Sequence, residues 1–548
     1  MISTTRRQFL AASAALPLPA QTKRPNVIVI ITDDQGYGDL SIHGNDKLQT
    51  PNMDSIAKEG VQFTQFQVCP VCSPTRSSLM TGRYNYRTGI VDTFLGRSMM
   101  HNDEVTLAEM LGAAGYRTGI FGKWHMGDNY PMRAIDQGFH EALVLKGGGI
   151  GQPADPPGGS SYFDPLLQHN GKQERKKGYC TDVYFDAAME FVDANRGRPF
   201  FIYVATNAPH DPLQVEESWV EPYRKLGLKD ATAKVYAMVK NIDDNVGRLL
   251  RKLKATGLER DTILVFMTDN GPQHDRYNAG MRARKTTVYQ GGIRVPCFVR
   301  WPAVVRAGRK VDRIAAHIDW FPTLAEACGG KLPADRKIDG RSLLALLRGE
   351  PPNWPDRTLF TQWHRGDVPE LFRDCAARTQ RWKLVNGKEL YDMQNDPAES
   401  ADVAVKHPDV AARLRKETEA WYKDVSATRG YDPPRIYLGA PQENPVVLTR
   451  QDWRGPRAGW DAGSIGYWEV DVRSRGRYDV TLDFAAAKEP GEAALSLGAI
   501  RLTEKVAAGA AQCKFRNLEM TPGPGRLEPL LRFGAKDLGV QYVTIAKL

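Results

Sequence analysis

Residues 24–39 of this chain read RPNVIVIITDDQGYGD, and their pattern indicates the fold class. The stretch contains an unbroken apolar run that ends in two adjacent acids, Asp33 and Asp34. Such a run is typical of a parallel strand that is buried on both faces, because a solvated face would alternate with polar residues. We therefore expect a buried strand here, with two carboxylates at its C-terminal tip.

Two further stretches have the same pattern. They are FFIYVATNAPH, residues 200–210, and DTILVFMTDNGPQ, residues 261–273, which carries Asp269 and Asn270 near its end. Residues 233–258, just before the latter, have helical periodicity. Alternating strands and helices predict an α/β fold with a mostly parallel central sheet flanked by helices. Ligands of such sheets bind beyond the carboxyl ends of the strands, so the three polar tips are expected to converge.

The chain is too long for one core, and its texture changes twice. We predict an α/β catalytic domain over residues 21–355 and a small α+β subdomain over residues 356–430. A Pro-rich linker, residues 431–445, then leads to strands with alternating polarity. Residues 446–548 are predicted to form a β-sandwich module.

Two features of the outer parts of the chain leave alternatives open. The module contains three tryptophans, Trp453, Trp460 and Trp468, which are either sugar-stacking platforms of a carbohydrate-binding domain or core residues. The strand alternation favours the core for Trp468. The glycine-rich insertion at residues 146–164 is either a wall of a substrate site or a surface loop.

The first twenty residues are predicted to be a signal peptide. Arg6 and Arg7 precede a short, weakly apolar run that ends near Ala20, which is the form of a twin-arginine export signal. We expect a mature chain without a membrane anchor, located in the periplasm or secreted. The net charge of +10 is mild for 548 residues, and no dense Lys/Arg tract indicates a nucleic-acid partner.

A cysteine lies at the start of a predicted helix in VCSPTRSSLMTGRY, residues 71–84. Ser73 is a suitable N-cap, Pro74 suits the first turn, and Gly82 is a plausible end. Cys72 then faces unpaired N–H groups, a position that favours an anion, and Arg76 lies one turn away. Cys72 is alternatively a buried thiol, half of a disulfide, or a thiolate nucleophile of the tyrosine-phosphatase kind.

The polar residues together indicate chemistry on an anionic ester. The acids and the amide at two strand tips offer hard oxygen ligands for Ca²⁺ or Mg²⁺. Cations and proton carriers come from three further stretches, GKWHMG (122–127), NAPH (207–210) and RKTTVYQGGIRVP (284–296). The residues concerned are Lys123, His125, His210 and Lys285. A divalent cation, several cationic side chains, two histidines and a nucleophile fit transfer or hydrolysis of a tetrahedral oxyanion ester.

At this point the sequence resembles a known family. The likeness is carried by eight stretches: PNVIVIITDDQGYGD, CSPTRSSLMTGRY, GYRTGIFGKWHMG, NAPHDP, MTDNGP, KTTVYQGGIRVP, HIDWFPTLAEACG and ELYDMQNDPAE. In this order, they are similar to stretches of the formylglycine-dependent sulfatases of the alkaline-phosphatase superfamily. The likeness covers about residues 24–425 and leaves the module outside. Gln290 departs from the glutamate that the family often has before its Gly-Gly turn.

The resemblance implies a role for each matching residue. A formylglycine-generating enzyme would oxidise Cys72 to formylglycine before export, and one Ca²⁺ would be bound by Asp33, Asp34, Cys72, Asp269 and Asn270. Arg76 and Lys123 would steady the hydrated aldehyde, and His125 would be the base that expels sulfate. His210 and Lys285 would hold the sulfate. Residues 274–276 follow the two expected metal ligands Asp269 and Asn270, and they are either substrate contacts or a surface loop.

The expected function is hydrolysis of sulfate esters, on sulfated saccharides or aryl sulfates. Two alternatives stay open. One is a phosphonate monoester or phosphodiester hydrolase of the same superfamily, whose site would be alike. The other is a non-catalytic glycan-binding protein, which the presence of every expected catalytic residue disfavours.

Overall fold

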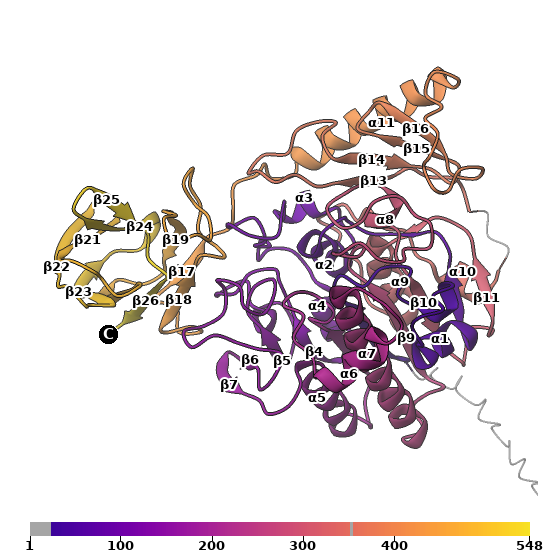
Figure 1. The fold of residues 1–548 in the computed structure, drawn as a ribbon, viewed down its shortest axis with the longest axis horizontal. Helices are drawn as coiled ribbons and strands as arrows, with labels where there is room; N and C mark the ends of the chain where they lie inside the picture. The colour runs from indigo at the N-terminus through magenta and orange to yellow at the C-terminus, as the bar shows by residue number, and fades with distance from the viewer. Residues whose placement is uncertain (1–23, 351–353) are drawn as a thin grey trace, which may run out of the picture.

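The computed structural model describes residues 24–350 and 354–548, so the predicted signal peptide lies outside the described residues. A ten-stranded sheet forms the centre of the catalytic domain (Figure 1). Its strands, in spatial order, are β11 (Arg309–Val311), β2 (Val61–Phe63), β10 (Cys297–Arg300), β9 (Thr262–Thr268), β1 (Asn26–Thr32), β8 (Phe200–Ala205), β4 (Arg117–Lys123), β5 (Glu141–Leu145), β6 (Leu166–His169) and β7 (Lys172–Arg175).

The five strands from β9 to β5 run parallel, and antiparallel pairs adjoin them on both sides. The predicted α/β class with a mostly parallel central sheet is thereby confirmed. A two-stranded sheet joins β3 (Phe66–Gln67) and β12 (Ala315–Ala316). The helices of this domain are η1 (Ser41–His43), α1 (Pro51–Lys58), α2 (Cys72–Thr81), α3 (Asn85–Thr88), α4 (Leu107–Ala113), η2 (Ala134–Asp136), α5 (Cys180–Ala194), α6 (Glu217–Arg224), α7 (Asp230–Ala255), α8 (Gln290–Ile293), η3 (His317–Asp319), α9 (Trp320–Cys328) and α10 (Leu344–Arg348).

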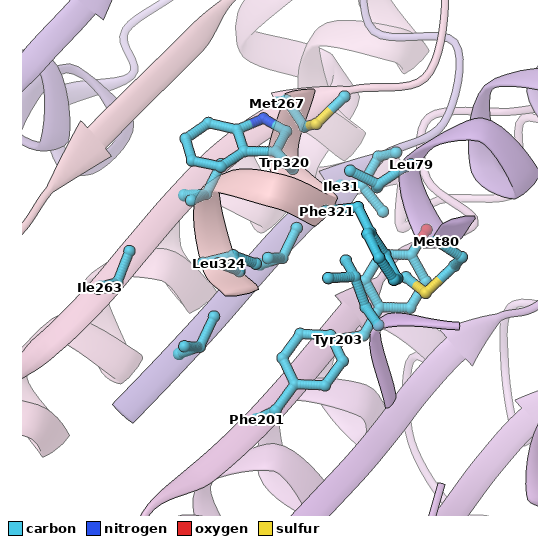
Figure 2. Close-up of a cluster of buried hydrophobic side chains, with 14 of the residues drawn as sticks. Ile31, Leu79, Met80, Phe201, Tyr203, Ile263, Met267, Trp320, Phe321 and Leu324 are labelled. Carbon is cyan, nitrogen blue, oxygen red and sulfur yellow. The ribbon is translucent and has the colours of Figure 1, made fainter. Parts of the chain in front are cut away.

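Strand β1 is buried on both faces, as its apolar run predicts. Val27, Val29 and Ile31 point into one hydrophobic core, while Ile28 and Ile30 point into a second core on the opposite face. Helices α2, α4 and α9 pack in the first core, and α1, α5 and α7 pack in the second. In Figure 2, Leu79 and Met80 of α2 lie against Phe321 of α9 and the sheet, so α2 is fixed firmly to the strands.

The small subdomain consists of a four-stranded antiparallel sheet and one long helix, drawn at the top of Figure 1. Its elements are β13 (Leu359–Gln362), β14 (Cys375–Arg378), β15 (Trp382–Val385), β16 (Glu389–Asp392) and α11 (Pro408–Ser426). The amphipathic helix packs through Leu414 against the sheet residues Leu384 and Leu390.

The C-terminal module, drawn from orange to yellow in Figure 1, lies to one side of the catalytic domain. Two sheets enclose one core. The first holds β17 (Ile436–Leu438), β19 (Trp468–Val472), β24 (Gly523–Phe533), β21 (Gly491–Leu497), β22 (Ile500–Val506) and β25 (Lys536–Leu538). The second holds β18 (Val446–Thr449), β26 (Tyr542–Lys547), β20 (Gly476–Asp483) and β23 (Gln512–Met520).

One expected boundary of the module needs correction, and the alternatives left open for its tryptophans can be decided. Residues 436–438, inside the predicted linker, form β17 and pair with β19, so the module's first strand begins before residue 446. Trp453 is fully buried beside Trp468, and both indoles therefore serve the core rather than a sugar surface. Trp460 alone of the three is exposed, and its ring meets Phe94 of the catalytic domain edge to face at 5.1 Å.

Among the described residues, no helix combines the length and apolarity needed to cross a bilayer.

Candidate active site

The acidic tips of β1 and β9 lie side by side. The two strands are parallel neighbours in register, with Thr32 opposite Thr268, so the residues that follow them emerge together. The backbone N–H of Asp34 donates to Asp269 Oδ1 at 3.2 Å, and Asn270 Nδ2 donates to Asp34 Oδ1 at 2.7 Å. All three side chains are buried. For these two of the three strand tips, the convergence expected from the sequence is present in the fold.

Cys72 is the first residue of α2 and faces this cluster. Its Sγ lies within 4.8 Å of a carboxylate oxygen of Asp33 and one of Asp269, as those two oxygens do of each other. Burial raises the pKa of the Cys72 thiol and outweighs the opposing influence of Lys123. All seven cysteines are free and buried, so none forms a disulfide.

The start of α2 differs from the prediction by two residues. The N-cap is Val71, in extended conformation and without a side-chain cap, whereas Ser73 is already helical. The Ser73 hydroxyl instead donates to the backbone carbonyl of His125 at 2.8 Å, because that carbonyl reaches the helix start from the end of β4. The predicted end is confirmed, since Gly82 has a left-handed φ of 69°.

Three cations pair with the three carboxylates. Arg76 Nη2 lies 2.8 Å from Asp269 Oδ2, Lys123 Nζ lies 2.6 Å from Asp33 Oδ2, and Lys285 Nζ lies 2.7 Å from Asp34 Oδ1. These ion pairs are almost entirely removed from solvent. The formal charges of the six side chains therefore cancel within one buried cluster.

The pairing shapes how the acids ionise. Burial disfavours ionised Asp34, but the ammonium of Lys285 and the nearby His210 hold the pKa of this carboxyl below its usual range. Burial and the negative charge of Asp33 raise the pKa of Asp269 to about 6, against the opposing charge of Arg76.

Both predicted histidines are neutral bases at neutral pH. His125 Nε2 donates to the carbonyl of Thr93 at 2.7 Å, and its Nδ1 has no partner among the described residues. Burial, helped by the charge of Lys123, lowers the pKa of His125 well below the ordinary value. Burial lowers the pKa of His210 to about 4, and its Nε2 lies 3.8 Å from Asp34 Oδ2.

The glycine-rich insertion lies against these histidines, which favours the wall over the surface loop. A Cβ on Gly148 would lie 2.6 Å from His125 Cε1, and one on Gly149 would lie 3.0 Å from His210 Cε1. The absence of a side chain at both positions lets the backbone approach the two imidazoles this closely. Sequence reasoning noted the insertion but did not single out these two glycines.

Two other sequence features lie behind the site. Arg276, which follows Asp269 and Asn270 in sequence, has a buried side chain that forms an ion pair with Asp39 at 2.6 Å and donates to the carbonyl of Asp34 at 2.9 Å. Arg276 therefore supports the backbone at Asp34 instead of belonging to a plain surface loop, while His274 pairs with Asp211 at 3.1 Å. Gln290 begins α8, and its N–H donates to Glu399 rather than to the cluster.

The fold and the site define an α/β enzyme that acts on oxyanion esters. The sulfatase family model matches residues 25–330, and the model of the N-sulphoglucosamine sulphohydrolase C-terminal region matches residues 283–424. The chain thus belongs to the sulfatase family and is a sulfuric ester hydrolase. The module after residue 430 lies outside both matches.

Known sulfatases are similar over most of the chain. N-acetylgalactosamine-6-sulfatase of Mus musculus is 31% identical over 424 residues, covering 72% of this chain and 79% of that protein. Arylsulfatase A of Homo sapiens is 31% identical over 468 residues, covering 78% and 88%. The crystal structure of Ps i-CgsB in complex with k-i-k-neocarrahexaose is similar with a TM-score of 0.68 and 30% identity, covering 75% of this chain and 95% of that one.

Proposed function

We propose that this sulfatase hydrolyses sulfate esters on sulfated carbohydrates, with formylglycine made from Cys72 as nucleophile and one bound Ca²⁺. The observation that carries the proposal is the single buried cluster formed by Cys72, three carboxylates and three cations. Such a cluster holds a doubly charged ion and an anionic ester next to each other without a large excess of either charge.

The donor atoms fit a calcium ion. Asp33 Oδ1 and Asn270 Oδ1 are buried oxygens without a hydrogen-bond partner among the described residues, and a buried polar atom of this kind is costly unless a ligand satisfies it. Oxygen-rich ligand sets favour Ca²⁺ over zinc. The ion would be held by Asp33, Asp34, Asp269, Asn270 and residue 72. When bound, Ca²⁺ would supply polarisation of the sulfate group.

The protonation state of the Cys72 thiol supports its conversion to formylglycine. A buried thiol whose pKa is raised is mostly protonated and a weak nucleophile. A hydrated aldehyde at this position would instead offer two hydroxyls, one to attack sulfur and one whose deprotonation expels sulfate. Because Cys72 is only 2% exposed, a formylglycine-generating enzyme would have to act on the chain before it folds.

The remaining side chains divide the other tasks. Arg76 and Lys123 lie beside the carboxylates that flank residue 72, where they would steady its oxygen atoms. Lys285 and His210 lie around Asp34, where they would hold the sulfate and deliver a proton to the leaving oxygen. His125, with an unpartnered Nδ1, would take the proton that releases sulfate.

A carbohydrate substrate and an extracytoplasmic location complete the proposal. N-acetylgalactosamine-6-sulfatase and the complex with k-i-k-neocarrahexaose are similar to this chain, which supports a sulfated glycan. The paired Arg6 and Arg7 support twin-arginine export to the periplasm or beyond.

Sulfate release from sulfated saccharides and from an aryl sulfate tests the substrate class. The enzyme is produced together with a formylglycine-generating enzyme, and Cys72→Ala serves as the inactive control. We expect kcat/KM to be highest on one saccharide and to vanish in the control. Turnover confined to aryl sulfate, or to a matched aryl phosphonate, would contradict the carbohydrate assignment.

A further inference from the structure

Residues 92–98, called the 92–98 loop below, connect the active site with the C-terminal module. The carbonyl of Thr93 accepts two hydrogen bonds, one from His125 Nε2 at 2.7 Å and one from Gln451 Nε2 at 2.8 Å. His125 belongs to the predicted catalytic set, whereas Gln451 follows β18 of the module. One backbone oxygen thus joins the module directly to a catalytic side chain.

Gln451 holds the loop at three points. Its side-chain nitrogen also lies 3.0 Å from Ser98 Oγ, and its backbone carbonyl accepts from the N–H of Gly96 at 3.0 Å. The side chain is 1% exposed, so water does not replace these bonds readily. A single residue of the module fixes the beginning, middle and end of the loop.

The loop is shaped to fit the module. Leu95 and Gly96 both have positive φ, 56° and 68°, and a Cβ on Gly96 would meet Arg454 Cγ at 2.7 Å. Arg454 Nη1 donates to the Gly96 carbonyl at 3.1 Å. Leu95 and Met99 are buried in the module's own hydrophobic core. A non-glycine residue with positive φ persists where the surroundings impose it, and here the module provides them.

The double acceptance at Thr93 decides which nitrogen of His125 carries the proton. A carbonyl oxygen only accepts, so His125 Nε2 must be the protonated nitrogen and Nδ1 the free base. The carbonyl offers two lone pairs, and Gln451 occupies the one that His125 leaves. Without the amide, the carbonyl would be free to rotate toward other donors and the imidazole would lose its fixed tautomer.

From these contacts we infer that Gln451 is a positioning residue of the sulfatase active site, through which the β-sandwich module sets the orientation and tautomer of His125. The inference rests on the proposed function only for the task given to His125. It extends the active site to a module that lies beyond both family matches.

Gln451→Met tests the inference, because it keeps the length of the side chain and removes both donated bonds. We expect kcat to fall by about tenfold or more, since a displaced general base loses much of its contribution, while KM stays within about twofold. Glu443→Gln is the matched control: Glu443 joins the same two domains through Asn129 and the N–H of Tyr130, away from the 92–98 loop. It should leave kcat nearly unchanged.

The tautomer gives a second readout that needs no turnover. In ¹⁵N-histidine NMR spectra, with the His125 signals assigned by their loss in His125→Asn, the native protein should show Nε2–H, and Gln451→Met should show a mixture. Should Gln451→Met fail to fold, Gln451→Glu keeps the shape, cannot donate when ionised and carries the same expectation. The tautomer measurement does not depend on turnover. If the native enzyme released no sulfate, the proposed function would be refuted, but the tautomer would still test the role of Gln451. An Nδ1–H tautomer in the native protein, or unchanged tautomer and kcat in the folded variant, would overturn the inference.

Discussion

Asp33 illustrates the balance of charge at the scale of one residue. One carboxylate oxygen is paired with Lys123 at 2.6 Å, while the other is buried without a partner among the described residues. The lysine lowers the cost of burying the carboxylate, and the free oxygen is left for a ligand. The same division recurs at Asn270, whose Nδ2 is bonded and whose Oδ1 is not.

Calcium should therefore stabilise the native protein. A ligand that binds only the folded state at about 100 times its dissociation constant adds about 2.7 kcal/mol. We expect Ca²⁺ to raise the Tm of the native chain, chelator to reverse the rise, and Asp33→Asn to abolish it. Asp243→Asn, a change at a buried carboxylate bonded to Asn52 and to the N–H of Met53, should keep the response. An Asp33→Asn protein that still responds fully would contradict the assignment.

His43 makes a pH-dependent contribution that can be isolated. Its Nδ1 donates to the carbonyl of Tyr37 and its Nε2 accepts from the amide of Gln62, so both nitrogens of the neutral ring are satisfied. Burial lowers the pKa of His43 to about 4, below its unfolded value of 6.5. The unfolded state therefore binds more protons between these pKa values, and the stabilisation is present above pH 6.5 and lost as the pH falls toward 4.

The shift corresponds to about 3 kcal/mol at most. Thermal unfolding of the native chain and of His43→Gln should differ more at about pH 7.5 than at about pH 5. A difference in Tm that is the same at both values would show that the His43 ring does not resist protonation in the folded protein.

At the scale of elements, helix α2 shows what local sequence can and cannot predict. Gly82 was predictable as its end, because a left-handed residue that follows a helix favours glycine. Its start was not: Ser73 is a suitable cap by type, yet its hydroxyl bonds to the carbonyl of His125, more than fifty residues away. A tertiary partner of this kind leaves no mark in the neighbouring sequence.

Gly82→Ala should destabilise the element that carries Cys72. A side chain at positive φ costs about 1 to 2 kcal/mol, and here the new Cβ would also lie 2.7 Å from Phe321 Cβ. Gly257→Ala is the matched control, because Gly257 has the same φ of 69° after α7 but no atom within 4 Å of the added carbon. Tm should fall in both variants and further in Gly82→Ala. Equal losses would mean that the contact with Phe321 relaxes at no cost.

In the whole molecule, the parallel sheet made most of the site predictable, whereas the contribution of the C-terminal module could not be predicted. Asp33, Asp34, Asp269 and Asn270 could be grouped from sequence because parallel strands bring their carboxyl ends to one edge. The contact of Gln451 with Thr93 could not, since it joins positions about 360 residues apart through loops without periodicity. Likewise, alternation indicated that Trp468 is buried but gave no such signal for Trp453.

Removal of the module should damage the catalytic domain. Leu95, Met99 and Met132 are buried in a core that the module mostly provides, so a chain ending at residue 430 would expose them. We expect the truncated chain to aggregate or to unfold at a lower temperature, and to lose sulfatase activity, when compared with the full chain by light scattering and thermal unfolding. A soluble, fully active truncated enzyme would show that the two domains are independent.

The mass of the tryptic peptide that spans residues 59–76 shows whether residue 72 is formylglycine, the proposed nucleophile. The peptide should come from active enzyme produced with a formylglycine-generating enzyme. We expect an aldehyde at residue 72, lighter than the thiol form and reactive toward hydroxylamine, with Cys69 unchanged in the same peptide. An unmodified cysteine at residue 72 in enzyme that releases sulfate at full rate would contradict it.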